Sequence, residues 1–497
     1  MTAKMSRREL LGLGLALAAS GCGPRGARGG AGGRGGSGGG GGGRGRVIVV
    51  GAGVAGLTVA HRLVAAGREV VVLEAQARVG GRVLTLREPF AGGLYVEAGA
   101  KHVVAEPGLM ALMQEVGVKL VKAARPAPAP RVVLRGGQRL VEPPDAEDPD
   151  EAALSEEERK LDFLGRMRRY FGAGFDADPR ASAWLSGEVA AADGQSLQAY
   201  LAARGASARF IADMAQSIAM GEPASAVSAA WVIQQAAAIR QEIGWSTGGT
   251  GGRVAGGSDA FPRALAARLG QRVLLGAAVR RIATGADGVR VGFERAGKLE
   301  EVSGARVVVT VHAPVLRSIV FTPALPAALQ QGLAAVRMAS ATLGWVELGR
   351  RVWDEAGVAG GAQTDDSWGG LRDETLAQPG PGGILSTYAS GPAARELAAL
   401  GEAARAARLR ALVERVHPGA AGAIAAVVTK AWDEDRFARG AYAWMPPGFL
   451  GEVVPALVRG ADRLHFAGDY LSYRPGFMHG AVASAERAAA EVLAARG

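Results

Sequence analysis

The sequence has 497 residues, enough for about three domains, and 48% of them are hydrophobic, so a large buried core is expected. The formal net charge is +10, but residues 1–46 hold eight Lys or Arg and only one Glu. The folded remainder therefore carries only a small excess of positive charge, spread along the sequence, which argues against a nucleic-acid-binding surface. Cys22 is the only cysteine, which excludes an intrachain disulfide and a cysteine-based cluster, and we expect no metal site.

The N-terminal segment, residues 1–22, is typical of an export signal. Arg7 and Arg8 precede the apolar run Leu10–Ala19, which is too short to span a bilayer. The arginine pair resembles a twin-arginine signal, and the small residues before Cys22 resemble a bacterial lipoprotein cleavage site. We therefore expect export to the cell envelope and membrane attachment through a lipid on Cys22. Residues 23–45 are mostly glycine and are predicted to be a flexible linker.

The stretch 46–82 has the pattern of a complete dinucleotide-binding unit. The apolar run Val47–Val50 predicts a buried strand, a glycine turn follows, and Leu57, Ala60 and Leu63 recur at helical spacing. A second apolar run ends at Glu74. Strand, glycine turn, helix, strand and acid all fall where such a unit requires them, so a chance GxGxxG is an inadequate explanation.

The residues of this unit have distinct predicted roles. Gly51 turns the chain sharply, Gly53 lets a pyrophosphate approach the backbone, and Gly56 lets the helix pack close to the sheet. The helix N-terminus offers unpaired N–H groups to the phosphates. Glu74 can accept hydrogen bonds from a ribose.

The continuation Arg78-x-Gly80-Gly81-Arg82 extends the motif beyond the needs of a nicotinamide site, and it resembles the flavin-containing amine oxidases. The resemblance spans roughly residues 46–496 and is weak over residues 106–250. It implies FAD as the cofactor. The implied FAD-binding residues are Gly51, Ala52, Gly53, Val54, Ala55, Gly56, Glu74, Ala75, Arg78, Gly80, Gly81, Arg82, Gly99, Ala100, Val279, Gly468, Asp469, Gly476, Phe477 and Met478.

The resemblance also places Lys101 and His102 in the substrate region, after a segment that runs beside the flavin. In the L-amino acid oxidases of this family, an arginine at the position of His102 pairs with the substrate carboxylate. The departure leaves an amino-acid substrate open to question. An ordinary surface role for both residues competes with this interpretation.

Near the C-terminus, the resemblance assigns Tyr442 and Phe477 to the two walls of an aromatic cage beside the flavin. Ala441 stands where the monoamine oxidases carry the cysteine that bonds to FAD, so we expect non-covalent FAD. A lysine that normally holds a water near flavin N5 aligns with Leu343, and no lysine occurs between Thr322 and Thr429. We therefore expect slow reaction with O2 unless another cation, with His102 or His479 the nearest candidates, replaces that lysine.

The predicted fold is an α/β FAD-binding domain of Rossmann type, built from residues 46–105, 250–312 and 430–497. Residues 106–249 and 313–429 are predicted to form an inserted α+β substrate domain. Within it, Ser155 and Glu158 form a predicted capping box, and Leu164, Met167 and Phe171 indicate a helix.

The expected function is FAD-dependent oxidation of a small amine by hydride transfer to the flavin. Three alternatives remain open: an L-amino acid oxidase, a flavin desaturase or dehydrogenase with an acceptor other than O2, and a non-catalytic FAD-stabilised binding lipoprotein. The sequence leaves the oligomeric state open.

Overall fold

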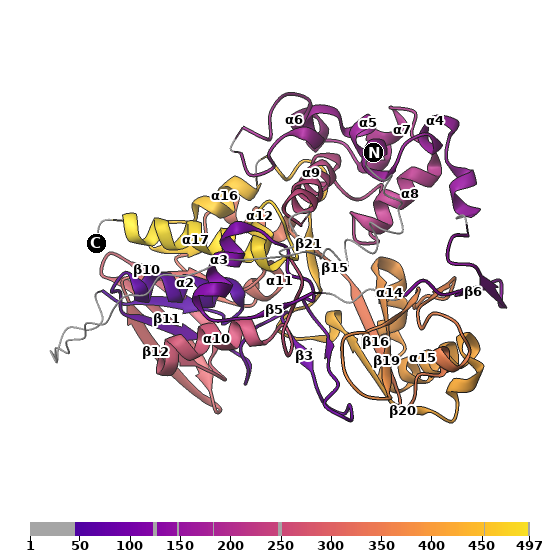
Figure 1. Cartoon of the computed structure of the whole chain (residues 1–497). Helices are drawn as coiled ribbons and strands as arrows, with labels where there is room; N and C mark the ends of the chain where they lie inside the picture. The colour runs from indigo at the N-terminus through magenta and orange to yellow at the C-terminus, as the bar shows by residue number, and fades with distance from the viewer. Residues whose placement is uncertain are drawn as a thin grey trace, which may run out of the picture.

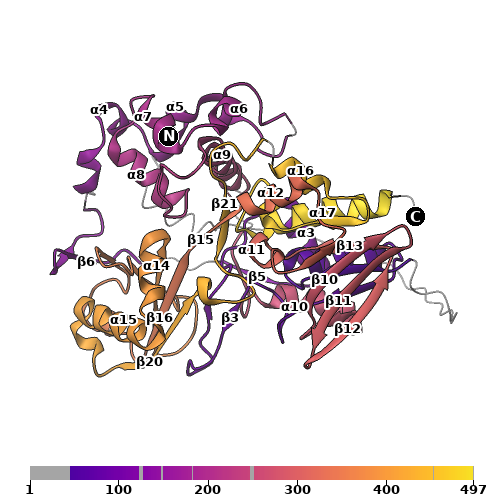
Figure 2. The same cartoon turned by 180° about the vertical axis from the view of Figure 1, so that it is seen from behind.

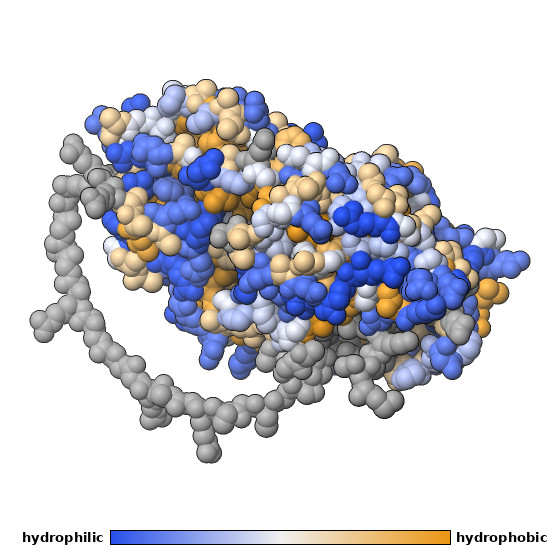
Figure 3. All heavy atoms as spheres, turned by 90° about the horizontal axis from the view of Figure 1, so that it is seen from above, coloured by the Kyte–Doolittle hydropathy of each residue, from blue (hydrophilic) through white to orange (hydrophobic). Residues whose placement is uncertain are grey.

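The computed structural model describes residues 45–122, 127–146, 149–181, 183–246, 251–451 and 453–495. The expected signal, its Cys22 and almost all of the linker lie outside these ranges. None of the helices within these ranges combines the length and apolar character needed to cross a bilayer. On the face seen from above, hydrophobic residues are interspersed with hydrophilic ones (Figure 3).

The first unit is built on a parallel five-stranded sheet with the order β22-β13-β1-β2-β9. The strands are β1 (Val47–Val50), β2 (Val70–Leu73), β9 (Val273–Leu274), β13 (Arg306–Val309) and β22 (Leu464–Phe466). All four residues of β1 are buried, as expected for the central strand of a sheet covered on both faces. Alternation sends Val47 and Val49 to one face and Ile48 and Val50 to the other.

Helices cover one face of this sheet, and a second sheet covers the other. Around Val47 and Val49 pack α2 (Val54–Ala65), α3 (Pro107–Glu115), α10 (Ala260–Leu269) and α17 (Met478–Ala494), which group together in Figure 1. Residues of a four-stranded sheet with the order β12-β11-β10-β14 share the opposite cluster with Ile48. Its strands are β10 (Ala278–Gly285), β11 (Gly288–Arg295), β12 (Lys298–Gly304) and β14 (Val320–Thr322).

The boundaries of this unit differ from those that the sequence predicts. Helix α3 buries Leu112 and Met113 in the same cluster as Val47, although residues 106–249 were expected in the substrate domain. Strand β14 pairs in parallel with β10 of the first unit, although residues 313–429 were expected in the substrate domain. Both segments are short and pack against the first unit. A local sequence pattern does not show which of two units a short segment packs against.

The second unit contains a seven-stranded sheet with the order β20-β16-β19-β18-β17-β6-β7. The strands are β6 (Arg131–Arg135), β7 (Gln138–Glu142), β16 (Ala341–Leu348), β17 (Ala362–Thr364), β18 (Leu371–Asp373), β19 (Gly383–Ser390) and β20 (Ile424–Ala431). Helices α14 (Gly391–Ala399) and α15 (Glu402–Val416) cover the face that carries Val346 and Leu385. The other face, with Trp345 and Ile384, packs on Phe90 and Val96 of the first unit.

A helical layer completes the second unit and is labelled along the top of Figure 2. It comprises α4 (Glu156–Arg159), α5 (Phe163–Asp176), α6 (Gly187–Asp193), α7 (Leu197–Ala202), α8 (Ala208–Ser217) and α9 (Ala229–Ser246). The capping box of Ser155 and Glu158 is present, but it opens the one-turn helix α4. The predicted longer helix, α5, is capped separately by Asp162 and is interrupted at Gly172, where φ is 54°.

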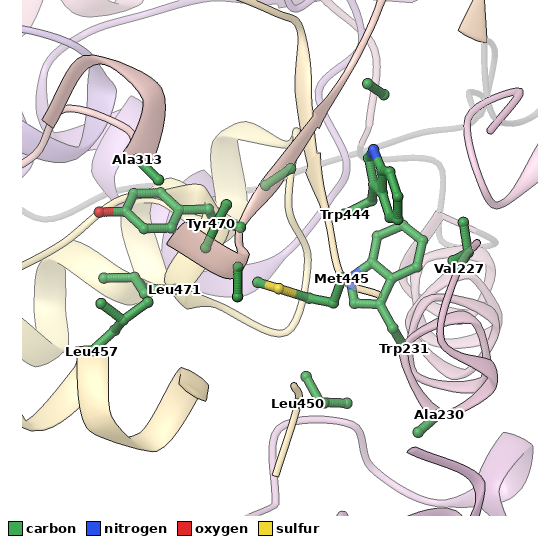
Figure 4. Packing of buried hydrophobic residues seen from close by; sticks show 14 of the residues in the cluster. Val227, Ala230, Trp231, Ala313, Trp444, Met445, Leu450, Leu457, Tyr470 and Leu471 are labelled. Atoms are coloured by element: carbon green, nitrogen blue, oxygen red, sulfur yellow. The ribbon is translucent and has the colours of Figure 1, made fainter. Parts of the chain in front are cut away.

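A hydrophobic cluster joins this helical layer to the C-terminal part of the first unit. In Figure 4, Trp231 of α9 and Trp444 lie close together, and Met445 extends from them toward Leu471. Trp444 ends β21 (Tyr442–Trp444), and Tyr470 and Leu471 follow β22. Large buried side chains of this kind each contribute roughly 1.5–3 kcal/mol of transfer free energy. The cluster therefore fixes the segment that carries Tyr442 against the helices.

Candidate cofactor and substrate site

A cavity of about 280 Å³ lies where β1, β2, β13 and β22 end. Its lining residues include Val50 and Leu73 at the strand ends, Thr310 just after β13, and Asp469 just after β22. Ligands of open α/β sheets bind outside the carboxyl ends of the strands, where the loops diverge. The position of the cavity is thus that of a cofactor site.

The glycine turn after β1 has the geometry that a pyrophosphate requires. Gly51 has a φ of 102°, and a Cβ on Gly56 would lie 2.0 Å from the Gly51 carbonyl oxygen, so neither position accepts a larger residue. A Cβ on Gly53 would meet no atom within 4 Å, so the space beside this backbone is open. No side chain caps the N-terminus of α2. Its free N–H groups and positive dipole end therefore face the cavity region.

Glu74 braces the turn as well as lining the cavity. Its Oε2 accepts a hydrogen bond from the Ala52 N–H at 2.7 Å, and its Oε1 accepts one from the Gln76 N–H at 2.8 Å. Burial raises the pKa of this carboxyl, against the effect of those hydrogen bonds. Each carboxylate oxygen has a second lone pair, so Glu74 can still accept from a ribose hydroxyl.

The two arginines of the extended motif have different positions. Arg78, which the resemblance assigned to the pyrophosphate, donates to the carbonyl of Gly81 at 2.8 Å and does not line the cavity. It holds the second glycine turn in place from behind. Arg82 does line the cavity, and its Nη1 donates to the Ala441 carbonyl at 2.7 Å.

Asp469 links Arg82 to the last cofactor segment. Its Oδ1 accepts from Arg82 Nη2 at 2.5 Å, and its Oδ2 accepts from the Gly476 N–H at 2.7 Å. Burial alone would raise the pKa of Asp469, but the charge and hydrogen bonds of Arg82 hold it below its usual value. Arg82, half-buried and paired with the buried Asp469, therefore joins three segments that are distant in sequence: the Arg82 turn, Ala441 and the loop after β22.

Tyr442 and Phe477 line the same cavity as the glycine turn. Gly476, with a φ of 85°, makes this possible, because a Cβ there would lie 2.4 Å from Tyr442 Cδ1. The Tyr442 hydroxyl is hydrogen-bonded to Tyr388, and burial raises the pKa of Tyr442. The guanidinium of Arg474 lies 3.9 Å from the centroid of the Phe477 ring, which orients it from behind.

Lys101 and His102 do not line this cavity. The Lys101 ammonium forms an ion pair with Glu374, and burial lowers the pKa of Lys101 to about 8. Burial, reinforced by the charges of Lys101 and Arg253, lowers the pKa of His102 well below its usual value. His102 is therefore neutral at pH 7 and does not supply the cation that the resemblance suggested.

His312 is a cavity residue that the sequence interpretation missed. It is 8% exposed, follows β13, and lines the cavity. Its Nε2 is buried and finds no hydrogen-bond partner among the described residues. Burial lowers its pKa to about 3, so it stays neutral and can donate or accept a single hydrogen bond. Its place at the carboxyl end of a parallel strand was the signal available in the sequence.

Most of the predicted cofactor residues meet at the cavity. Ala52, Gly56 and Arg78 lie behind the lining. The lining includes Gly51, Gly53, Val54, Ala55, Glu74, Ala75, Gly80, Gly81, Arg82, Gly99, Ala100, Val279, Gly468, Asp469, Gly476, Phe477 and Met478. In the part of the chain that the structure describes, no group of three or more His, Cys, Asp or Glu could hold a metal ion.

An open glycine turn, an uncapped helix N-terminus, a ribose acceptor and the unpartnered His312 together fit a dinucleotide, and the aromatic pair extends the cavity beyond it. Such a site fits the class of flavin-dependent oxidoreductases. The sequence matches the model of the flavin containing amine oxidoreductase family over residues 54–493, and the chain belongs to that family.

Individual relatives agree with this assignment. An L-amino-acid oxidase of Siganus canaliculatus is 28% identical over 479 residues, covering 90% of this chain and 85% of the relative. A putative flavin-containing monoamine oxidase of Mycobacterium tuberculosis is 29% identical over 459 residues, covering 90% and 96%.

Solved structures confirm the predicted fold class. Putrescine oxidase bound to putrescine superposes with a TM-score of 0.77 at 24% identity, covering 91% of this chain and 99% of that one. Cyclohexylamine oxidase from Brevibacterium oxydans gives a TM-score of 0.74 at 24% identity, covering 90% and 98%. The α/β cofactor domain with an inserted substrate domain is therefore the fold of this protein.

Proposed function

We propose that this protein oxidises a small amine with a non-covalently bound FAD. The observation that carries the proposal is that Tyr442 and Phe477 line the cavity that begins at the glycine turn. Bound FAD would accept a hydride from the carbon next to nitrogen, and water would hydrolyse the imine to a carbonyl compound and an amine or ammonium. The relatives and the fold support this chemistry without naming the substrate.

The residues around the cavity supply orientation and a dry environment. Burial raises the pKa values of both Tyr442 and Tyr388, so both hydroxyls stay protonated at neutral pH and neither acts as a base. The substrate nitrogen must therefore arrive neutral. Phe477 is the N-cap residue of α17 and Met478 is its first residue. This N-terminus has no side-chain cap and can stabilise negative charge that develops in the cavity.

Replacing Tyr442 or Phe477 by leucine tests the aromatic cage. Leucine keeps apolar volume but removes the two flat faces that restrict how the amine approaches. We expect flavin reduction by a substrate amine to slow by about 10- to 100-fold while FAD content is unchanged. Anaerobic stopped-flow absorbance at the flavin band measures the rate. Tyr442→Phe is the matched control, because it keeps the ring and loses only the bond to Tyr388. If the leucine variants lose FAD instead, both residues are structural.

Ala441 supports non-covalent attachment of FAD. It lines the cavity and is 5% exposed, and its methyl group cannot form a bond to a flavin. We expect acid precipitation to release all of the yellow colour into the supernatant. Flavin that stays with the protein pellet would contradict this proposal.

We also propose that the protein is exported and anchored to the cell envelope through Cys22. The arginine pair, the short apolar run and the position of the only cysteine support this. Expression of Cys22→Ala should move the protein from the membrane fraction to the soluble fraction, because a lipid anchor would be lost. A variant that stays in the membrane fraction would exclude lipidation at this residue.

A further inference from the structure

A buried ion pair lies behind Phe477, one of the two aromatic residues of the cavity. Arg474 Nε donates to Glu242 Oε1 at 2.5 Å, and Arg474 Nη2 donates to Glu242 Oε2 at 3.0 Å. The remaining nitrogen, Nη1, donates to Gln235 Oε1 at 3.1 Å. Arg474, Glu242 and Gln235 are each at most 5% exposed. The guanidinium is therefore fixed in position and shielded from water.

The two sides of this ion pair come from different parts of the fold. Glu242 and Gln235 belong to α9 of the helical layer, and their spacing of seven residues, about two turns, puts them on the same side of that helix. Arg474 and Phe477 belong to the segment between β22 and α17. Gln235 Nε2 also donates to the carbonyl oxygen of Tyr473 in this segment, at 3.2 Å. Helix α9 thus determines where the Arg474 guanidinium lies relative to Phe477.

Both members of the pair are charged at neutral pH. Burial alone would raise the pKa of Glu242, but the charge of Arg474 and the hydrogen bonds that the carboxylate accepts lower it to about 2. The guanidinium of an arginine does not lose its proton in a protein. Glu242 binds the edge of the guanidinium, where its N–H groups point, whereas the Phe477 ring lies 3.9 Å from it, measured to the ring centroid. The ring therefore meets the positive charge at close range.

This charge changes what the Phe477 ring can bind on its other side. The guanidinium covers one face of the ring, so the opposite face and the ring edge are left for a molecule in the cavity. An aromatic face attracts a cation because its π system is negative. A cation already held on one face repels a second cation on the other, and repulsion is strong where water is excluded. The wall formed by Phe477 is therefore better suited to a neutral nitrogen than to an ammonium.

We propose that Arg474, held by Glu242, makes the aromatic cage select the neutral form of an amine and reject the ammonium form. Arg474 does not line the cavity, so it is a positioning residue that acts through Phe477. The inference rests on the proposed amine oxidation. The nitrogen lone pair of a neutral amine forms the C=N bond of the imine as hydride leaves the neighbouring carbon, whereas an ammonium has no lone pair to do so. Selection of the neutral form keeps the unreactive form out of the cage.

Two ligands of one shape test this inference without turnover. Phenyltrimethylammonium carries a permanent positive charge, and tert-butylbenzene is its neutral counterpart. Each is titrated into FAD-loaded protein, and the change in flavin absorbance gives its Kd. We expect wild-type protein to bind the neutral ligand more tightly. The double variant Glu242→Gln/Arg474→Met should lower the ratio of the ammonium Kd to the neutral Kd by about 10-fold. It removes both charges together, so neither is left buried without the other.

Two further variants complete the test. Arg204→Met is the matched control, because Arg204 lies 3.6 Å from the centroid of the Tyr200 ring in α7, outside the cavity lining, and it should leave the ratio unchanged. Arg474→Lys keeps the ion pair, but its compact ammonium can move toward Glu242 and away from the Phe477 ring. We expect it to lower the ratio about threefold, and it decides the question alone if the double variant loses FAD.

An unchanged ratio would overturn the inference. Equal weakening of both ligands in the Arg474 variants would show that the ion pair only supports the structure, because a structural defect does not distinguish a charged ligand from a neutral one of the same shape. If no amine reduces the flavin, the proposed function fails, and the ratio of the two Kd values still decides the role of Arg474.

Discussion

Replacing Asp469 by alanine is expected to lower the free energy of unfolding of the FAD-loaded protein by about 1–3 kcal/mol. The substitution leaves the half-buried guanidinium of Arg82 without its carboxylate and leaves the Gly476 N–H without an acceptor. Donors that lose their partner in a partly desolvated site cost about this much. Urea unfolding followed by tryptophan fluorescence measures the loss.

Two further variants serve as controls. One separates the charge of Asp469 from its shape, and the other measures the effect of removing an unrelated aspartate. Asp469→Asn keeps the shape and one acceptor, so its loss should be smaller than that of alanine. Asp287→Ala removes an exposed aspartate from the turn between β10 and β11 and should change stability by less than about 0.5 kcal/mol. A loss in Asp469→Ala no larger than that in Asp287→Ala would contradict the role of the ion pair.

The pH dependence of this ion pair has a definite sign. The pKa of Asp469 is lower in the folded protein than its ordinary value. Its contribution to stability is therefore complete above the ordinary pKa of an aspartate and is lost as pH falls through the lower, folded value. The stability difference between wild type and Asp469→Ala should accordingly shrink on acidification and not on raising the pH.

The reduced protein is expected to react slowly with O2, and Leu343→Lys is expected to accelerate that reaction by about 10- to 100-fold. Transfer of the first electron makes superoxide, and a nearby cation stabilises that anion in a site that excludes water. Leu343 occupies an apolar cluster with Tyr442. Leucine there supplies no charge.

Three basic side chains in this region do not replace the missing lysine, because one is paired, one is neutral and one lies further away. Lys430 lies directly opposite Leu343 on β20, but its Nζ lies 3.1 Å from Asp435 and 4.4 Å from the centroid of the Trp432 ring. His102 is neutral at pH 7 because burial lowers its pKa. Arg372 is separated from Leu343 by strand β19, which places the two about 10 Å apart at the backbone.

Stopped-flow mixing of anaerobically reduced protein with oxygenated buffer measures the rate directly. Leu343→Met is the matched control, because it changes shape and flexibility without adding charge, and it should leave the rate near that of wild type. Wild-type reoxidation that Leu343→Lys does not accelerate, at unchanged FAD content, would show that charge at this position is irrelevant. The expected slow wild-type rate would point to a quinone or another envelope acceptor as the natural oxidant.

Local patterns predicted the cofactor side well because its information is contiguous. The strand, glycine turn, helix and Glu74 lie within a single short stretch, and backbone sterics and strand alternation dictate what each residue does there. Arg78 shows the limit of this reasoning. The motif identifies the residue, but only the three-dimensional structure shows that its guanidinium holds the Gly81 carbonyl behind the cavity.

The substrate side was not predictable in the same way. Lys101 and Glu374 are 273 residues apart in sequence, and they meet because β18 and the segment after β4 (Val96–Glu97) face one another across the two units. Such a contact is not visible in a local pattern, since it depends on how distant strands align.

The central claim, amine oxidation at the cavity beside Tyr442, is tested most directly by mixing FAD-loaded protein with a panel of amines and amino acids without oxygen. We predict complete bleaching of the flavin band by at least one of them, with one equivalent of carbonyl product formed per FAD. Absence of bleaching by every amine and amino acid, in protein that dithionite reduces normally, would contradict the account and favour a desaturase or a non-catalytic binding protein.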